Sequence, residues 1–362
     1  MSLNMRPRIL FFSYHQFGLL VDTVKYCEHL RGTYNITYLG WDYGKPKLEL
    51  EGVAVKYVSR SGSLFRRNVN LLKALNHEVE TGKYDIVFLH YTRGVSIVRL
   101  LHPKQRMIFD VRTLSVDPNR LKRKTYNTVL KVEGGLFRNR SVISEGVGTQ
   151  IGFKNYHLLP LGADPILTAP VAGQTDRLRL LYVGTLLNRD VIKCVQGLKH
   201  YIEMTGDSNV ELTIVGDSSG NERQDILDYV DRHPSLAGKV TCPGRVPHQQ
   251  LGRYFLNADI GVSFIPMTRW YNFQPPTKTF EYLLSGIPVI ATKTYENVNL
   301  LKFEHMSALI EDNSADFSRG ISELKIKLPH LNAQALKERY EGYSWQNIVD
   351  RYFSKMIDSV II

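Results

Sequence analysis

The sequence has few cysteines, no long apolar run and no clustered histidines. Its three cysteines, spread along 362 residues, are odd in number and too far apart for a disulfide framework or a zinc site, so they predict free thiols in a reducing cytoplasm. No apolar run approaches the roughly 18 residues that a membrane-spanning helix needs, and there is no signal-peptide pattern. The 11 histidines show no HxxxH or HxH spacing, and we therefore expect no metal.

The length and composition are those of a two-domain globular protein. A chain of 362 residues is long for one core and suits two domains of about 150 to 180 residues. Hydrophobic residues make up 43% and charged residues 22%, which is ordinary for such a protein. Residues 165–175 contain Pro and Gly and little apolar content, which predicts a linker.

The excess of positive charge is confined to the first half of the chain. Residues 1–164 hold 25 Lys and Arg against 13 Asp and Glu, whereas residues 165–362 hold 21 against 22. A basic half predicts an anionic partner, which could be nucleic acid, anionic lipid or a phosphorylated substrate, or else a merely solvated basic surface. The densest run is Arg120–Lys124. The amphipathic segment 61–80, with its basic residues, suits either a membrane surface or an ordinary core helix. No nucleic-acid-binding motif is visible, which disfavours that partner.

Apolar strands alternate with helical patterns through the chain. Residues 8–13 read as a buried strand, 14–18 as a loop and 19–30 as a helix, which is the opening of a Rossmann-like unit without a GxGxxG fingerprint. A fresh buried strand at 179–184, followed by a helix from about Asn188, opens a second unit. The pattern predicts an α/β protein with two Rossmann-like domains.

The most informative stretch is 275–292, PPTKTFEYLLSGIPVIAT. Thr277 is the expected N-cap of a short helix, and Gly286 is its expected C′ residue before a buried strand. A helix N-terminus with Lys278 in its first turn is a natural seat for a diphosphate. Glu281, one turn further on, can accept hydrogen bonds from two adjacent sugar hydroxyls.

The spacing of Lys278, Glu281, Gly286, Pro288 and Val289 resembles the signature of the family 4-like (group 1) glycosyltransferases. The alternative is an ordinary helix–strand unit with a solvated Lys–Glu pair. The resemblance implies the GT-B fold, in which two Rossmann-like domains face each other across a cleft. It implies an acceptor domain over 1–166, a nucleotide-sugar donor domain over 167–342, and a final helix over 343–362 that crosses back to the first domain.

The resemblance also implies roles for individual residues on the donor side. Glu281 would hold the ribose, and cations would neutralise the leaving diphosphate in place of a metal. Arg189 and Lys193, four residues apart and expected on one helix face, would supply that charge with Lys278. The remaining donor-binding residues implied are Thr277, Thr279, Gly184, Thr185, Arg245, Val246 and Gly18.

Acceptor-side residues are implied in the first domain. Tyr14 and His15 follow the first strand, and Asp110 and Arg112 stand at the end of another, where parallel sheets place site residues. The alternatives are that His15 is a structural hydrogen bonder and that Asp110 and Arg112 form a structural ion pair. In addition, Phe273 stands where many family members carry a second Glu, which leaves the stereochemistry and the sugar preference open.

Together these features predict a glycosyltransferase that moves a sugar from a UDP- or GDP-sugar to a saccharide or lipid-linked acceptor. The resemblance implies retention of anomeric configuration, no metal cofactor, and work in polysaccharide or glycoconjugate biosynthesis. We expect a cytoplasmic protein that associates peripherally with the inner face of an anionic membrane through its basic half. The alternatives are a catalytically weak GT-B binding or assembly protein and a basic nucleic-acid-binding protein.

Overall fold

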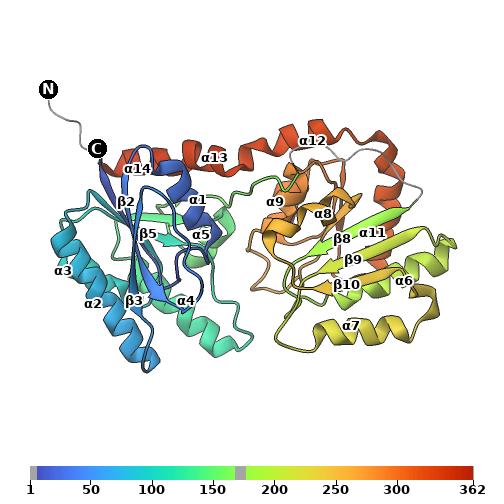
Figure 1. Ribbon diagram of the computed structural model, residues 1–362, viewed down its shortest axis with the longest axis horizontal. Helices are drawn as coiled ribbons and strands as arrows, with labels where there is room; N and C mark the ends of the chain where they lie inside the picture. The colour runs from blue at the N-terminus through green and yellow to red at the C-terminus, as the bar shows by residue number, and fades with distance from the viewer. Residues whose placement is uncertain (1–5, 168–176, 362) are drawn as a thin grey trace. The chain divides into compact units, whose positions relative to one another are not determined.

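The computed structural model describes residues 6–167 and 177–361, and these form two α/β units (Figure 1). Unit 1 comprises Met1–Leu161 and Trp345–Ile362, and unit 2 comprises Gly162–Ser344. The division therefore falls between residues 161 and 162, whereas the sequence placed it between 166 and 167. Of the expected linker, residues 165–167 lie in unit 2 and residues 168–175 lie outside the described part of the chain.

Unit 1 is built on a parallel sheet with the strand order β3-β2-β1-β4-β5-β6-β7. The order reverses between β1 and β4, so that the loops after these two strands diverge and leave room for a ligand at the carboxyl edge. The strands are β1 (Arg8–Phe12), β2 (Asn35–Asp42), β3 (Val53–Ser59), β4 (Ile86–His90), β5 (Met107–Val111), β6 (Asn139–Val142) and β7 (His157–Leu158).

The carboxy-terminal segment completes the core of unit 1. The Phe353 ring centroid lies 4.7 Å from that of Tyr26 and 5.2 Å from that of Phe88, and Trp345 packs edge-on against Tyr26. Residues from both ends of the chain thus bury one another. The helices of this unit are α1 (Val21–Leu30), α2 (Leu64–Gly82), α3 (Val95–Leu101), α4 (Arg120–Gly134), α5 (Glu145–Ile151), α13 (Trp345–Ile348) and α14 (Ser354–Ile361), with a π-helical turn (Val349–Phe353) before α14.

Unit 2 is built on a second parallel sheet with the order β10-β9-β8-β11-β12-β13. The order reverses between β8 and β11, which creates the same kind of crevice at their carboxyl ends. The strands are β8 (Leu178–Val183), β9 (Val210–Val215), β10 (Val240–Gly244), β11 (Ile260–Ser263), β12 (Val289–Thr292) and β13 (Ser307–Ile310).

Helix α6 (Ile192–Thr205) and helix α11 (Ser314–Lys327) bury apolar faces in the core of unit 2. Leu198 and Phe317, one from each helix, are fully buried in the same cluster as Leu180 and Ile214 of the sheet. The other helices are α7 (Glu222–Asp231), α8 (Gly252–Leu256), α9 (Thr277–Leu284), α10 (Tyr295–Leu301) and α12 (Ala333–Tyr340).

One predicted helix start is wrong. Helix α6 begins at Ile192 and not near Asn188, because Asn188 and Asp190 adopt left-handed backbone angles (φ 56° and 52°) that no right-handed helix accommodates. Arg189 therefore lies in the turn that precedes α6. The expectation that Arg189 and Lys193 share one helix face is wrong for the same reason.

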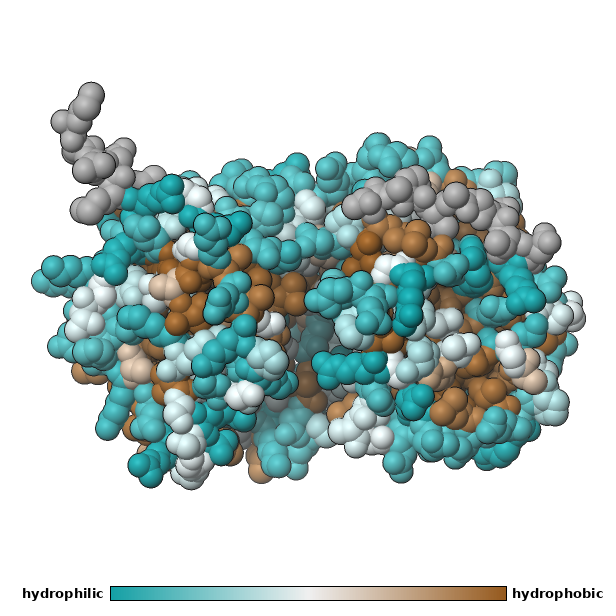
Figure 2. Space-filling model, viewed as in Figure 1, coloured by the Kyte–Doolittle hydropathy of each residue, from teal (hydrophilic) through white to brown (hydrophobic). Residues whose placement is uncertain are grey.

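Hydrophilic side chains cover most of the visible face of each unit, with hydrophobic ones among them (Figure 2). Within residues 6–167 and 177–361, no helix combines the length and the hydropathy that crossing a bilayer requires.

Candidate functional site

A cavity of about 270 Å³ lies at the carboxyl ends of β8 and β11 in unit 2. Its walls come from residues 182–185 at the end of β8, residues 262–265 at the end of β11, and residues 274–278, which lead into α9. This is the point at which the strand order reverses, where open parallel sheets bind their ligands.

The charge in this cavity is positive. Arg189 and Lys278 both line it, and none of the lining residues is a carboxylate. The Arg189 guanidinium carbon lies 4.1 Å from the ring centroid of Tyr271, and this cation–π contact orients the side chain. Two cations beside a helix N-terminus make a site for an anion.

The start of α9 differs by one residue from the prediction. Pro276 is the N-cap, Thr277 is the first helical residue, and no side chain caps the helix. The expected capping role of Thr277 is therefore wrong, because the extended backbone of Pro276 (φ −84°, ψ 112°) already occupies the position before the first turn. Thr277 is exposed at the rim of the cavity. The predicted ending of this helix is confirmed, since Gly286 follows the C-cap Ser285 with φ 75°.

Glu281 does not line the cavity but is joined to it through Lys278. The Glu281 residue is 6% exposed, and its Oε2 accepts a hydrogen bond from Nζ of Lys278. Lys278 lines the cavity, whereas Glu281 does not. Oε1 of Glu281 has no protein hydrogen-bond partner within the described residues. The carboxylate thus fixes a cation of the cavity and keeps one oxygen available.

The other predicted donor residues fall into two groups. Gly184 and Thr185 line the cavity. Thr279 does not, because its buried hydroxyl bonds to Ser263 Oγ (2.7 Å) and Asn297 Oδ1 (3.3 Å) and ties α9 to its neighbours. Close packing of the backbone also shapes the wall: a Cβ atom on Gly216 would lie 1.8 Å from the carbonyl oxygen of Gly184.

Four predicted donor-side residues are not among those that line this cavity. Lys193 pairs with Asp190, with 3.0 Å between Nζ and Oδ2, and is not in the lining. Arg245 is exposed and Val246 half-buried, and neither lines the cavity. Gly18 belongs to unit 1, where it forms a turn with φ 98°.

Unit 1 carries a buried polar network at the carboxyl edge of its sheet. Asp110 at the end of β5 is fully buried and accepts a hydrogen bond from the Ser141 hydroxyl (2.6 Å), while its Oδ2 lies 3.1 Å from Nδ1 of His90. Nε of Arg112 lies 2.9 Å from Oδ2 of Asp22. Oδ2 of Asp110 also lies 3.9 Å from Nε of Arg112, as the alternative of an ion pair between them requires, while Nη2 of Arg112 is buried without a hydrogen-bond partner among the described residues. The acceptor-side role of these two residues stays a prediction.

Asp22 and His90 were missed by the sequence analysis. His90 is the last residue of β4, so the rule that site residues stand at strand ends could have found it. Burial disfavours the charged form of Asp22, but Arg112, His90 and the Thr23 N–H outweigh that effect and keep the pKa of this carboxyl below its usual value. Asp22 lies on α1, and nothing in its sequence context points to the contact with Arg112.

Tyr14 and His15 lie beside this network in the loop after β1. Both are partly buried, their ring centroids are 4.0 Å apart, and Nδ1 of His15 lies 3.3 Å from the Ser13 hydroxyl. Burial and the neighbouring His90 lower the pKa of His15 to about 4, against the opposing effect of Asp22. The imidazole is therefore neutral at pH 7 and can accept a hydrogen bond from a hydroxyl group.

This pKa predicts an acid-sensitive contribution to stability. The unfolded chain binds a proton at His15 near pH 6.5, whereas the folded chain resists it until about pH 4, so stability is lost as the pH falls between these values. The full effect would be about 3 kcal/mol, and partial exposure reduces it to about 1 to 2 kcal/mol. We expect the urea concentration at the midpoint of unfolding of unit 1 to depend less on pH over this range in His15→Gln than in the wild-type protein. The exposed His77→Gln is the control, and an NMR titration midpoint of the His15 ring near 6.5 would contradict the assignment.

Among the residues that the structure describes, no group of three or more His, Cys, Asp or Glu side chains is placed to hold a metal ion.

Comparison with solved structures identifies the fold. Sucrose-phosphate synthase from Thermosynechococcus elongatus superposes with a TM-score of 0.75 at 17% identity, over 98% of this chain and 99% of that one. An α,α-trehalose-phosphate synthase (UDP-forming) from Burkholderia vietnamiensis gives 0.74 at 11% identity, over 99% and 98%. Anabaena Alr3699/HepE in complex with UDP gives 0.71 at 14% identity, over 98% and 100%. The fold is GT-B.

The amino-acid sequence also matches a known protein family. Residues 177–325, most of unit 2, match the family described as "Glycosyl transferases group 1". This segment is therefore a group 1 glycosyltransferase domain, and the protein is a glycosyltransferase. Comparison with curated proteins finds no match.

Proposed function

We propose that the protein transfers a sugar from a nucleotide-sugar to a saccharide or lipid-linked acceptor. The observation that carries this proposal is the cavity at the reversal point of the unit 2 sheet, lined by Arg189 and Lys278 beside the N-terminus of α9. The described residues that line this space are cations and neutral groups, so a diphosphate suits it.

Glu281 completes the donor site in this proposal. Its free Oε1 accepts hydrogen bonds from the ribose hydroxyls, while Lys278 holds Oε2 and so fixes the carboxylate. Such a contact orients the donor and takes no part in breaking the glycosidic bond.

Departure of the nucleoside diphosphate is the chemical step that this site favours. Negative charge grows on the leaving oxygen, and Arg189, Lys278 and the α9 N–H groups stabilise it without a metal. Each such group contributes about 2 to 4 kcal/mol to lowering the barrier. We propose retention of configuration on the basis of the family resemblance.

UDP is our first choice of nucleotide. One structural neighbour was solved in complex with UDP, and another with UDP-2-fluoro glucose. A thermal-shift screen against UDP-, GDP- and ADP-sugars tests the choice, followed by assays of donor hydrolysis and transfer with the ligands that bind. Stabilisation by one class and turnover of it are expected. Binding without any turnover would instead favour a GT-B binding or assembly protein, and an absence of both would overturn the proposal.

We propose that the acceptor lies at a membrane surface. The protein would act there from the cytoplasmic side, in polysaccharide or glycoconjugate synthesis. Helices that follow parallel strands begin at the carboxyl edge of the sheet, so α2 and α4 both begin at the edge that carries His90 and Asp110. Leu64 and Phe65 at the start of α2 are 70% and 81% exposed. The run Arg120–Lys124 opens α4. Exposed apolar side chains and a basic run at the same edge of a sheet suit an anionic bilayer.

We expect Leu64→Ser with Phe65→Ser to reduce retention on vesicles of phosphatidylcholine and phosphatidylglycerol by about tenfold or more, because each buried apolar side chain contributes about 1.5 to 3 kcal/mol. Sedimentation with vesicles measures the fraction of protein that is retained. Phe303→Ser with Met204→Ser, equally exposed in unit 2, is the matched control. Equal retention of both double variants would count against membrane docking through α2. Retention on random DNA that neutralising Arg120–Lys124 abolishes would favour the nucleic-acid alternative.

A further inference from the structure

A second cavity, of about 390 Å³, lies in unit 1 at the opposite edge of its sheet. Its walls come from Arg99 of α3, residues 103–107, residues 138–139, and Ser359 and Val360 of α14. Met107 and Asn139 are the first residues of β5 and β6, so the cavity lies at the amino ends of these strands. Three residue steps along β5, about 10 Å, separate Met107 from Asp110 at the carboxyl edge.

The polar lining of this cavity is strongly basic. Four of the ten lining residues, Arg99, Lys104, Arg106 and Arg138, are cations, and none is a carboxylate. Some cations of unit 1 do have acidic partners, as Lys56 has in Glu78 (2.7 Å). Within the described residues, none of these four forms an ion pair with Asp or Glu. Four like charges around one space repel each other, and a bound anion relieves that repulsion.

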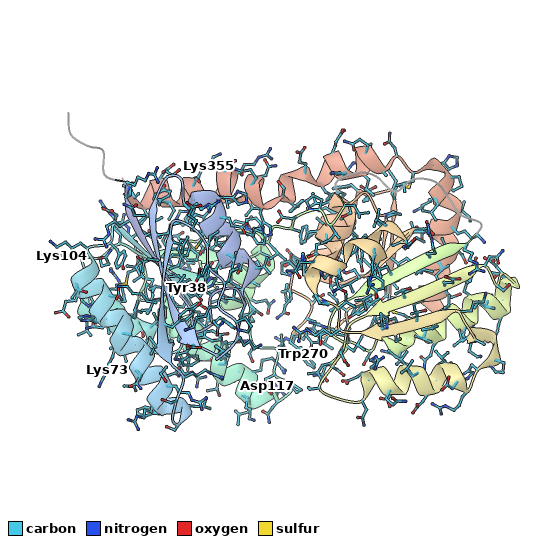
Figure 3. The ribbon with its side chains drawn as sticks, in the orientation of Figure 1. Tyr38, Lys73, Lys104, Asp117, Trp270 and Lys355 are labelled. Carbon is cyan, nitrogen blue, oxygen red and sulfur yellow. The ribbon has the colours of Figure 1, made fainter. Side chains whose placement is uncertain are left out.

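Hydrogen bonds hold part of the cavity lining in place before any ligand binds. Nη1 of Arg99 donates to the carbonyl oxygen of Gln105 (3.0 Å), and Nε2 of Gln105 donates to the carbonyl oxygen of Tyr84 (2.9 Å). The segment before β5 is thereby tied to the segment before β4. The Lys104 side chain extends outward from unit 1 (Figure 3). The hydrogen bonds within the lining reduce the conformational entropy lost on binding, because these groups are already ordered.

The geometry points to a binding site for a ligand that carries two or more phosphate charges, such as a diphosphate group. A single carboxylate would neutralise one of the four cations, whereas a diphosphate matches most of them. Arginine also binds phosphate oxygens in pairs through its planar fork. The site belongs to unit 1 and shares no residue with the donor cavity of unit 2, so it stands independently of the proposed reaction.

Calorimetry of the full chain with inorganic pyrophosphate tests this site. Arg106→Glu with Arg138→Glu should weaken one binding event by about tenfold or more, because each replaces an attraction by a repulsion. Lys73→Glu with Arg351→Glu, exposed cations of unit 1 outside the lining, gives the same change in net charge and should leave that event unchanged. Arg189→Ala should also leave it unchanged, since it alters only the donor cavity.

A second experiment, with vesicles, distinguishes a lipid head group from a soluble ligand as the source of the phosphate. Retention on phosphatidylcholine vesicles that contain phosphatidic acid, lost in the Arg106→Glu, Arg138→Glu variant, would identify a lipid head group. Binding of pyrophosphate without such retention would identify a soluble ligand, and either result supports the site. The single variant Arg138→Gln keeps the test valid if the double variant unfolds. Wild-type protein that binds neither probe, or equal loss in the two double variants, would overturn the proposal.

Discussion

Glu281→Ala is expected to weaken the binding of the nucleotide-sugar by about 100-fold or more. The side chain is almost fully buried, and one of its oxygens holds Lys278 while the other is available to the donor. Hydrogen bonds to a charged group contribute about 1.5 to 3 kcal/mol each, so losing two of them accounts for this effect. Calorimetry with the donor identified in the thermal-shift screen measures it.

Two comparisons separate ribose binding from a merely structural role. Glu203→Ala removes an exposed carboxylate that also pairs with a lysine, Lys199, and should change nothing. If Glu281 acts only by holding Lys278, then Lys278→Ala and the double variant should lose as much affinity as Glu281→Ala. A larger loss in the Glu281 variant, with an unchanged unfolding temperature, supports the direct contact. Undiminished affinity in Glu281→Ala would remove the basis for the donor site.

Arg189→Ala is expected to lower kcat more than it lowers donor affinity. The guanidinium lines the cavity and is oriented by the Tyr271 ring. A group that stabilises the leaving diphosphate acts mainly on the transition state, so kcat should fall by about 30- to 1000-fold, corresponding to about 2 to 4 kcal/mol. Steady-state kinetics together with equilibrium donor binding give both quantities.

Lys193→Ala is the matched control for Arg189. Both were predicted to serve the leaving group, but Lys193 pairs with Asp190 and lies outside the cavity lining. Its loss should change kcat by less than about threefold, within the range of a partly exposed ion pair. Tyr271→Leu should lower kcat by an intermediate factor, because Arg189 keeps its charge and loses the ring that orients it. A pure loss of affinity in Arg189→Ala would contradict a role in the departure of the diphosphate.

Local sequence patterns predicted helix and strand features well where these depend on neighbouring residues. The buried strands predicted over residues 8–13 and 179–184 form as Arg8–Phe12 and Leu178–Val183, and α9 ends with the predicted Gly286. Helical spacing of Phe280, Leu283 and Leu284 also gives α9 a buried apolar face. Each of these follows from neighbouring residues: an apolar run for a buried strand, helical spacing, and a glycine that can adopt a left-handed angle.

Contacts between residues far apart in the sequence were not predicted. Nothing near Thr279 in the sequence indicates that its hydroxyl bonds to Ser263 and Asn297, 16 and 18 residues away. The turn at Asn188 and Asp190 displaced the expected start of α6 and separated Arg189 from Lys193. The pairing of Asp22 with Arg112 joins residues 90 positions apart, which no periodicity reveals.

The class of the protein follows from its local sequence patterns: parallel α/β units, a basic first half, and a Lys–Glu helix at a strand boundary that is typical of a glycosyltransferase. Which of the predicted site residues share a cavity depends instead on the fold. The strand order brings the ends of β8 and β11 together with the start of α9, and it leaves Lys193 and Arg245 outside. Secondary structure follows from interactions between near neighbours, whereas a site depends on the close approach of segments that the chain keeps far apart.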